Sequence, residues 1–397
     1  MEVVGSRLEG HLRVLCAEIG ERHLGSEGEK RAVAYITAQL EAAGCTVRRE
    51  EFSAPGWTYG IYRLAVPAAG RTFPCFPCFY SNTARATGKL LPVDLERLEE
   101  LTPERVRGRV CFVRGRFTHV GDTNAAAQRL EDLGAAAMIF PSPYPHTLST
   151  KVVRNPELKS LAVVTVSGAT ADAMTAFLHQ EFSLEVVAHN FTFSACNVVG
   201  RLGGEGSPQA VIGAHYDTAP GIQGAWDNAS GVAVLLELAR LLYHEGVTFP
   251  LDLVAFGGEE FGGKAGYGLG GLRYVERHAD ALPGLVWMGC VDGVGAREGE
   301  LIAGVGRSED LRQRVAEACG AAVRVGDFQK GSDHNVFHDR GVPTLAFMER
   351  GKHGEGWPVP VHAPEDCLDA MDFDRLTQCC RLIGGVFCTL IHSEAGR

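Results

Sequence analysis

The chain has 397 residues, more than one ordinary domain length, and so predicts either two domains or one large domain with an insertion. Hydrophobic residues make up 45% and charged residues 22%, close to the averages for soluble globular proteins, which excludes wholesale disorder. The 38 Lys and Arg against 48 Asp and Glu give a formal charge of -10, which argues against nucleic acid and acidic membranes as partners.

The N-terminal stretch mixes charges into its apolar positions, unlike a secretory signal peptide, and no run approaches the roughly 18 apolar residues of a membrane span. We therefore expect a cytoplasmic protein without a membrane partner, and nothing in the sequence indicates an oligomer. Many of the 12 cysteines lie in apolar runs, such as Cys111 and Cys290, which is typical of buried thiols. Cys75 and Cys78 form a lone C-x-x-C, for which loop packing is favoured over a metal or redox role.

The first segment predicts the opening of an α/β domain. Helical patterns cover Leu8–Ile19 and Lys30–Ala43, separated by a Gly-rich turn at 25–28. Gly44 ends the second helix, and Thr46–Phe52 alternates like a strand.

A separate set of strands and helices is predicted between Pro67 and Glu185. Strands are predicted over 108–114, 135–140 and 161–166, and helices over 124–133 and 170–178. This pattern predicts a self-contained βαβ-like unit with no acidic or histidine cluster of its own.

From Asn197 onward, short apolar runs alternate with helical runs. The runs are 198–199, 211–213, 251–256, 285–291 and 344–348, and the clearest helices are 229–244, 309–319 and 372–391. Apolar strands separated by helices indicate a mixed, mostly parallel central sheet with helices on both faces. Ligands of such sheets gather beyond the carboxyl ends of the strands.

Metal-type side chains follow three of these predicted strands. His215 and Asp217 follow the run at 211–213, Glu259 and Glu260 follow Leu251–Phe256, and Asp292 follows Val291. We expect the three strand ends to deliver these imidazole and carboxylate groups to one edge of the sheet.

Two loops add further candidates. Asp227 precedes the helix at 229–244, and His362 lies in a late loop. Taken alone, Asp227 would be a helix cap and His362 an ordinary surface or core histidine. Together with the strand-end residues, however, they form a set of imidazoles and carboxylates that suits zinc, and a carboxylate can bridge two ions.

In this order and spacing the motifs resemble the M28 family of zinc-dependent metallopeptidases, which contains aminopeptidases, some carboxypeptidases and the related glutaminyl cyclases. Gly25–Gly28 resembles the family's opening segment, and Ser332–Phe337 resembles its S-D-H-x-x-F segment. Residues 67–185 resemble the protease-associated domain that some members insert. The resemblance implies a discontinuous zinc exopeptidase-like domain, 1–66 and 186–397, around a smaller inserted α/β domain, 67–185.

The resemblance also implies roles for the candidate residues and two zinc ions per chain, with Co²⁺ or Mn²⁺ as alternatives. The five implied ligands are His215 and Asp292 for one ion, Glu260 and His362 for the other, and Asp227 between them. Glu259 would be the general base, and Asp217 would orient the site. The substrates would be peptides, and the implied activity is that of an aminopeptidase.

Two other functions remain open. A glutaminyl cyclase would use one zinc ion, and a noncatalytic binding protein on a peptidase scaffold would not need Glu259. Gly258–Lys264 nearly matches a phosphate-binding loop, but Ala265 replaces the required Ser or Thr, so nucleotide binding is rejected. The side-chain preference of the first pocket would depend on the Gly-rich loops 262–271 and 351–360.

Overall fold

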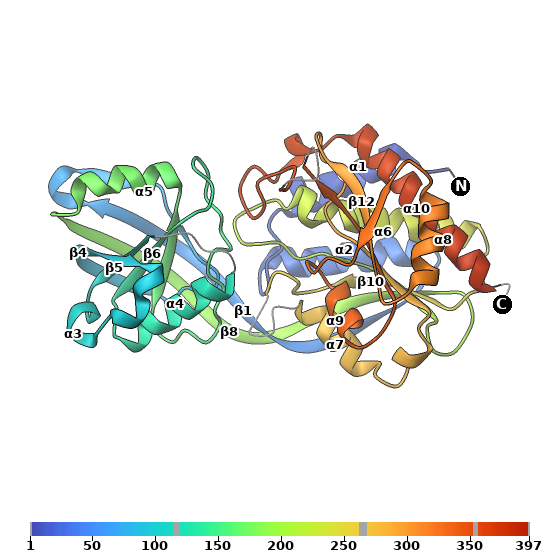
Figure 1. Ribbon diagram of the computed structural model, residues 1–397, viewed down its shortest axis with the longest axis horizontal. Coiled ribbons are helices and arrows are strands. Elements are labelled where there is room, and N and C mark those ends of the chain that lie inside the picture. The colour runs from blue at the N-terminus through green and yellow to red at the C-terminus, as the bar shows by residue number, and fades with distance from the viewer. Residues whose placement is uncertain (1, 115–119, 262–267, 352–355, 396–397) are drawn as a thin grey trace.

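The protein has two lobes joined by a pair of long strands, as the computed structural model in Figure 1 shows. The structure describes residues 2–114, 120–261, 268–351 and 356–395. Both chain ends lie in the larger lobe, and the smaller lobe is built from the middle of the sequence. Among the described residues, no helix combines the length and apolarity needed to cross a membrane.

The elements alternate along the chain as in other α/β proteins. The strands are β1 Thr46–Val66, β2 Arg71–Phe73, β3 Phe76–Pro77, β4 Ala84–Asp94, β5 Val110–Arg114, β6 Ala137–Pro141, β7 Ala162–Val166, β8 Glu181–Leu202, β9 Ala210–His215, β10 Leu251–Phe256, β11 Trp287–Val291, β12 Glu300–Gly306, β13 Arg324–Asp327 and β14 Thr344–Arg350. The α-helices are α1 Gly5–Arg13, α2 Glu27–Ala42, α3 Pro103–Val106, α4 Val120–Asp132, α5 Gly168–Met174, α6 Ser230–His244, α7 Leu269–Arg277, α8 Glu309–Cys319, α9 His334–Asp339 and α10 Phe373–Ala395.

A mixed sheet forms the centre of the larger lobe, as predicted. Its strand order is β13-β12-β14-β11-β9-β10-β8. Strands β10, β9, β11 and β14 run parallel to one another, whereas β8 and β12 are antiparallel to their neighbours β10 and β14. The carboxyl ends of β9, β10 and β11 therefore lie side by side.

The strands β1 and β8 are much longer than their patterns predicted and connect the lobes. They have 21 and 22 residues and pair antiparallel from Thr46↔Arg201 to Ala65↔Ser183. At one end β8 pairs with β10, and at the other end it pairs with β4 of the smaller lobe. The alternation of buried and exposed residues breaks where each strand is exposed, at 60–63 in β1, including Ile61 at 68% exposure, and at 189–192 in β8.

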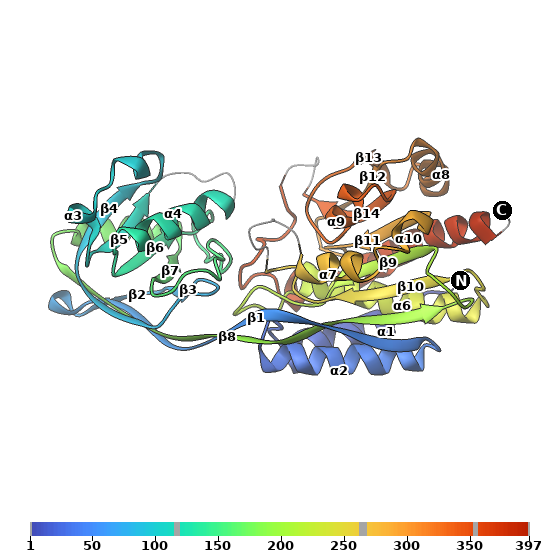
Figure 2. The same cartoon turned by 90° about the horizontal axis from the view of Figure 1, so that it is seen from below.

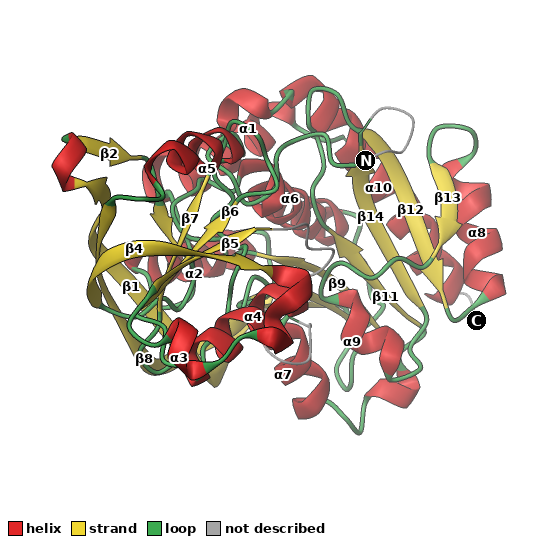
Figure 3. Cartoon of the chain, turned by 60° about the vertical axis from the view of Figure 1, so that its left-hand side comes forward, coloured by secondary structure: helices red, strands yellow, loops and turns green. Residues whose placement is uncertain are grey.

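Helices cover both faces of the central sheet (Figures 2 and 3). The larger core packs α1, α2, α6 and α10 against one face, and α7 and α9 cover the other with Tyr274 and Phe337. In the smaller lobe, the parallel strands β4, β5, β6 and β7 carry a core on each face. One of these cores also includes Leu24 and Leu269, so the lobes share apolar packing.

Local sequence explains most element boundaries, and two predictions needed correction. The α2 helix starts at Glu27 because the Ser26 hydroxyl accepts a hydrogen bond from the Glu29 amide at 3.0 Å, while the Glu29 carboxylate accepts one from the Gly25 amide at 2.8 Å. The helical stretch predicted over 8–19 begins earlier, at Gly5, and ends at Ile19 as predicted, but its second half, Val14–Ile19, is a π-helix. Strand β12 was missed because its glycines break the apolar run.

Candidate metal centre

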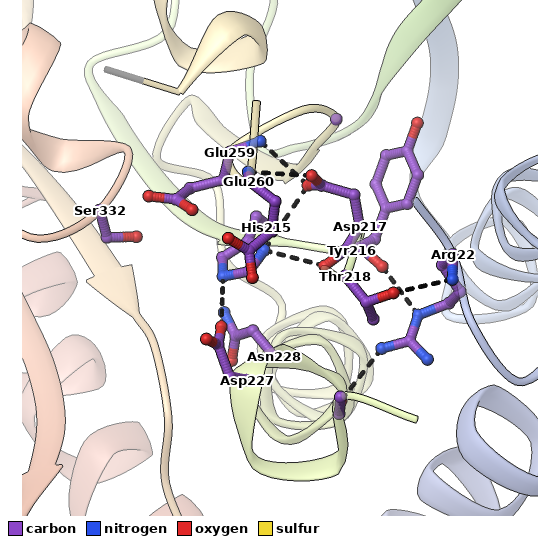
Figure 4. A network of polar contacts seen from close by, with 12 residues as sticks. Arg22, His215, Tyr216, Asp217, Thr218, Asp227, Asn228, Glu259, Glu260 and Ser332 are labelled. Atoms are coloured by element: carbon purple, nitrogen blue, oxygen red, sulfur yellow. Dashed lines mark hydrogen bonds and ion pairs between the residues drawn. The ribbon is translucent and has the colours of Figure 1, made fainter. Parts of the chain in front are cut away.

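The ends of three neighbouring strands deliver the predicted side chains to one place. His215 is the last residue of β9, Asp292 follows β11, and Glu260 lies in the turn after β10. Asp227 comes from the irregular segment before α6, and His362 from the loop before α10. The structure therefore brings all five predicted ligands together, and Figure 4 shows His215, Asp227 and Glu260 among them.

The five ligands form two groups that share Asp227. His215, Asp227 and Asp292 form one group, and Asp227, Glu260 and His362 form the other, with ligand atoms within 4.8 Å of one another in each. His215 Nε2 lies 3.1 Å from Asp227 Oδ1 and 3.4 Å from Asp292 Oδ1. His362 Nε2 lies 3.3 Å from Asp227 Oδ2 and 3.4 Å from Glu260 Oε1.

The donor atoms fit divalent cations. His215 and Glu260 are fully buried, and His215 Nε2 and Glu260 Oε1 make no hydrogen bond of good geometry to any residue in the described ranges. A buried polar atom without a hydrogen bond is costly, and one cation in each ligand group would satisfy these two atoms. Imidazole nitrogen and carboxylate oxygen are the ligands that zinc accepts in such sites.

The electrostatics of the cluster show how closely its charges are packed. Burial alone would lower the pKa of His215, but the surrounding Asp292, Asp217 and Asp227 carboxylates raise it well above its usual range. Burial raises the pKa of Asp292. Burial and the Lys151 ammonium lower the pKa of His362 to about 4, which keeps this imidazole neutral and available as a ligand.

Asp217 holds the turn that carries both glutamates. Its two carboxylate oxygens each accept one backbone hydrogen bond, from the Glu259 and Glu260 amides at 3.0 Å. Its Oδ1 also lies 3.6 Å from His215 Nδ1. The turn separates the glutamates, because the Glu260 side chain is 1% exposed while that of Glu259 is 15% exposed and lines the cavity described below.

Asp366 positions one loop ligand, and the other has an unusual backbone conformation. The Asp366 carboxylate accepts hydrogen bonds from the Trp226 amide at 2.7 Å and the Asp227 amide at 3.1 Å, so the late loop fixes the shared ligand. Burial and the Asp227 charge raise the pKa of Asp366 to about 7. His362 adopts a left-handed backbone with φ +57, a conformation that costs a non-glycine residue about 1 kcal/mol and often occurs at functional sites.

A cavity of about 310 Å³ opens beside the two ligand groups. Asp227, Asp292 and His362 form part of its wall, together with Glu259 and Trp226. A volume of this size accommodates a small ligand of one or two residues. Of the two loops expected to shape the first pocket, residues 262–267 and 352–355 lie outside the described residues.

Sequence reasoning missed two cations that the smaller lobe contributes to this cavity. Lys151 and Arg154 lie in the irregular segment between β6 and β7, and both line the cavity. The Lys151 ammonium forms an ion pair with Glu260, and Arg154 Nη1 donates to the Glu260 carbonyl oxygen at 3.0 Å. No motif marks this segment, so no signal in the sequence could have placed it here.

Asp333 and His334, in the segment that resembles S-D-H-x-x-F, do not hydrogen-bond to each other. His334 Nε2 pairs with the Gln329 carbonyl oxygen at 2.8 Å. Asp333 is fully buried, and its carboxylate oxygens have no hydrogen-bond partner among the residues described. Burial and the Glu259 charge raise its pKa well above the usual range.

The α/β fold and the paired ligand groups are those of metal-dependent exopeptidases. A family model described as peptidase family M28 matches residues 197–386, which include all five ligands. Residues 197–386, nearly half of the chain, therefore match peptidase family M28.

Individual relatives share both sequence and fold. The chain is 25% identical over 402 residues to "Aminopeptidase YwaD" of Bacillus subtilis (strain 168), covering 96% of this chain and 83% of that protein. The solved structure of "BSAP, a zinc aminopeptidase from Bacillus subtilis" superposes with a TM-score of 0.80 at 23% identity, covering 98% of this chain and 96% of that one. A glutaminyl cyclase from Porphyromonas gingivalis is more distant, with a TM-score of 0.53 at 15% identity and 99% of both chains covered.

Proposed function

We propose that this protein is a zinc-dependent aminopeptidase that uses two zinc ions. The observation that carries the proposal is the pair of ligand groups that share Asp227, beside a cavity lined by Glu259. The family match and the similarity to an aminopeptidase support the same activity. We assign His215 and Asp292 to one ion, Glu260 and His362 to the other, and Asp227 to both.

Zinc held by these groups supplies Lewis acidity, which polarises a carbonyl group and lowers the pKa of water to about 7. We assign the proton transfer to Glu259, because it is the carboxylate of the turn that faces the cavity. In this role it takes the proton of the attacking water and gives it to the leaving amine. Asp217 is a positioning residue, since it holds the amides of both glutamates.

The test combines metal analysis with the Glu259→Gln variant. We expect the variant to lose peptide hydrolysis by at least about 10³-fold while keeping two zinc ions, because Gln cannot accept the proton but fills the same space. Asp217, which holds the same turn, stays in place in this variant. Hydrolysis at the wild-type rate would show that Glu259 is not the base.

The substrates in this test also separate the alternatives. Peptides with a free N-terminus, peptides with a blocked N-terminus and peptides starting with glutamine should be compared. Release of N-terminal residues with two metals supports an aminopeptidase, pyroglutamate formation with one supports a cyclase, and neither reaction supports a binding protein. Two predictions from the sequence are carried as proposals: that residues 67–185 form a protease-associated domain, and that the protein is cytoplasmic.

A further inference from the structure

The cavity beside the ligand groups has a cationic wall. Lys151 and Arg154 form it from the smaller lobe, and Lys330 adds a third positive charge from the segment before α9. The carboxylates of the cavity are two predicted metal ligands and the predicted base Glu259. If Asp227 and Asp292 bind cations, Glu259 is the one carboxylate among the described lining residues whose charge is not neutralised by a metal. The remaining wall therefore attracts negative charge.

Arg154 is held in place by hydrogen bonds, and in the described part of the chain its guanidinium feels the charge of Glu259 without a direct ion pair. One of its N–H groups donates to the Glu260 carbonyl oxygen, and its backbone amide donates to Asn124 Oδ1 at 2.8 Å. Among the described residues, no ion pair joins its half-buried guanidinium to a carboxylate. A sheltered charge without a partner is costly, and a planar guanidinium suits a carboxylate that binds through two oxygens.

Lys151 is the second sheltered cation, with a side chain that is 6% exposed. Its ammonium contacts Glu260 and lies 3.7 Å from Glu259 Oε2. Because Glu260 is a predicted ligand, a cation bound there would repel the ammonium. The flexible side chain of Lys151 can then turn toward the cavity that it already lines.

The backbone around both cations is fixed to the two lobes. The Thr150 amide donates to the His362 carbonyl oxygen at 2.8 Å, which ties the segment to the larger lobe. The Thr123 hydroxyl donates to the Val152 carbonyl oxygen, which ties the segment to α4 of the smaller lobe. This part of the smaller lobe is therefore a built wall of the cavity.

We propose that Lys151 and Arg154 bind a carboxylate of the substrate, so that the enzyme prefers peptides with a negative charge close to the scissile bond. The proposal rests on the proposed peptidase function and adds its substrate class. Two kinds of peptide present such a carboxylate: a dipeptide through its free C-terminus, and a longer peptide through an N-terminal Asp or Glu side chain.

Two matched pairs of substrates test the preference and separate its sources. The first pair is Leu-Gly and Leu-Gly-amide, which differ in the C-terminal charge. The second is Glu-Gly-amide and Gln-Gly-amide, which differ in the side-chain charge. We expect the charged member of at least one pair to have a kcat/KM about 10-fold or more above its neutral partner.

Variants then assign the preference to the two cations. Lys151→Met and Arg154→Met should each lower kcat/KM for the charged member by about 10- to 100-fold more than for the neutral member. Lys159→Met, at an exposed lysine of the same lobe, is the control and should change neither. Calorimetry with Glu259→Gln should show the same charged-over-neutral preference in Kd, independent of turnover.

The outcomes separate this proposal from the function on which it rests. If the wild type hydrolyses both members of both pairs with equal kcat/KM, the carboxylate proposal is wrong and the peptidase function stands. If no peptide is hydrolysed, the proposed function is wrong, and the calorimetric comparison alone decides on carboxylate binding. Equal Kd values within both pairs would then overturn it.

Discussion

The two lobes reach the same cavity in different ways. The larger lobe places His215, Glu260 and Asp292 at or just beyond the ends of parallel strands, whose hydrogen-bond ladders fix the backbone before the side chains emerge. The smaller lobe instead uses an irregular segment, whose Lys151 and Arg154 are fixed by hydrogen bonds to both lobes. The difference indicates a division of labour, in which the larger lobe holds the metal and the smaller lobe faces the substrate.

The strongest test of this division removes a metal ligand. We expect His215→Ala or His362→Ala to lower activity by at least about 10³-fold and to reduce bound zinc from two ions to one or none, because each removes a nitrogen ligand. Metal analysis by mass spectrometry and kcat/KM measure both effects. His189→Ala, at an exposed histidine of β8, is the control. Two zinc ions retained in either ligand variant would contradict the corresponding assignment.

A core substitution in the smaller lobe sharpens the comparison. Phe140 on β6 is 1% exposed, and Phe140→Ala should lower the free energy of unfolding by about 3–5 kcal/mol through the cavity it leaves. The zinc content of the folded variant should stay at two, since all ligands belong to the larger lobe. Denaturant unfolding and metal analysis check these outcomes, with exposed Ile61→Ala as the control. Loss of metal from the folded variant would show that the division fails.

The pH dependence of the free energy of unfolding tests how the larger lobe buries Glu29 of α2. Burial raises the pKa of Glu29 from 4.5 to about 8, so folding favours its protonated form. This contribution to stability is fully present below pH 4.5 and is lost as the pH rises through about 8. Relative to Glu29→Gln, the wild type should lose about 3 kcal/mol between pH 5 and 8.5, measured by denaturant unfolding. Glu27→Gln, at an exposed position of the same helix, should keep the wild-type slope.

The sequence predicted much of the fold and the positions of the ligand set, for physical reasons. Runs such as Leu251–Phe256 are buried on both faces of the sheet. Their mostly apolar composition therefore marks them as strands in the sequence alone. The long ribbon of β1 and β8 was underestimated, because exposed runs at 60–63 and 189–192 interrupt the alternation that marks a strand. The hydrogen bonds of Asp366 to the loop of Asp227 were not predictable, because they join segments about 140 residues apart.

What the amino-acid order determined by itself is the chemistry at the strand ends, since a residue that follows a buried parallel strand must emerge at the shared edge of the sheet. Only the tertiary structure decided that Lys151 and Arg154 face this edge. Their segment has no periodic pattern, and its place depends on how one lobe docks against the other. That docking depends on shared apolar packing and a few backbone hydrogen bonds between distant segments, which local sequence does not encode.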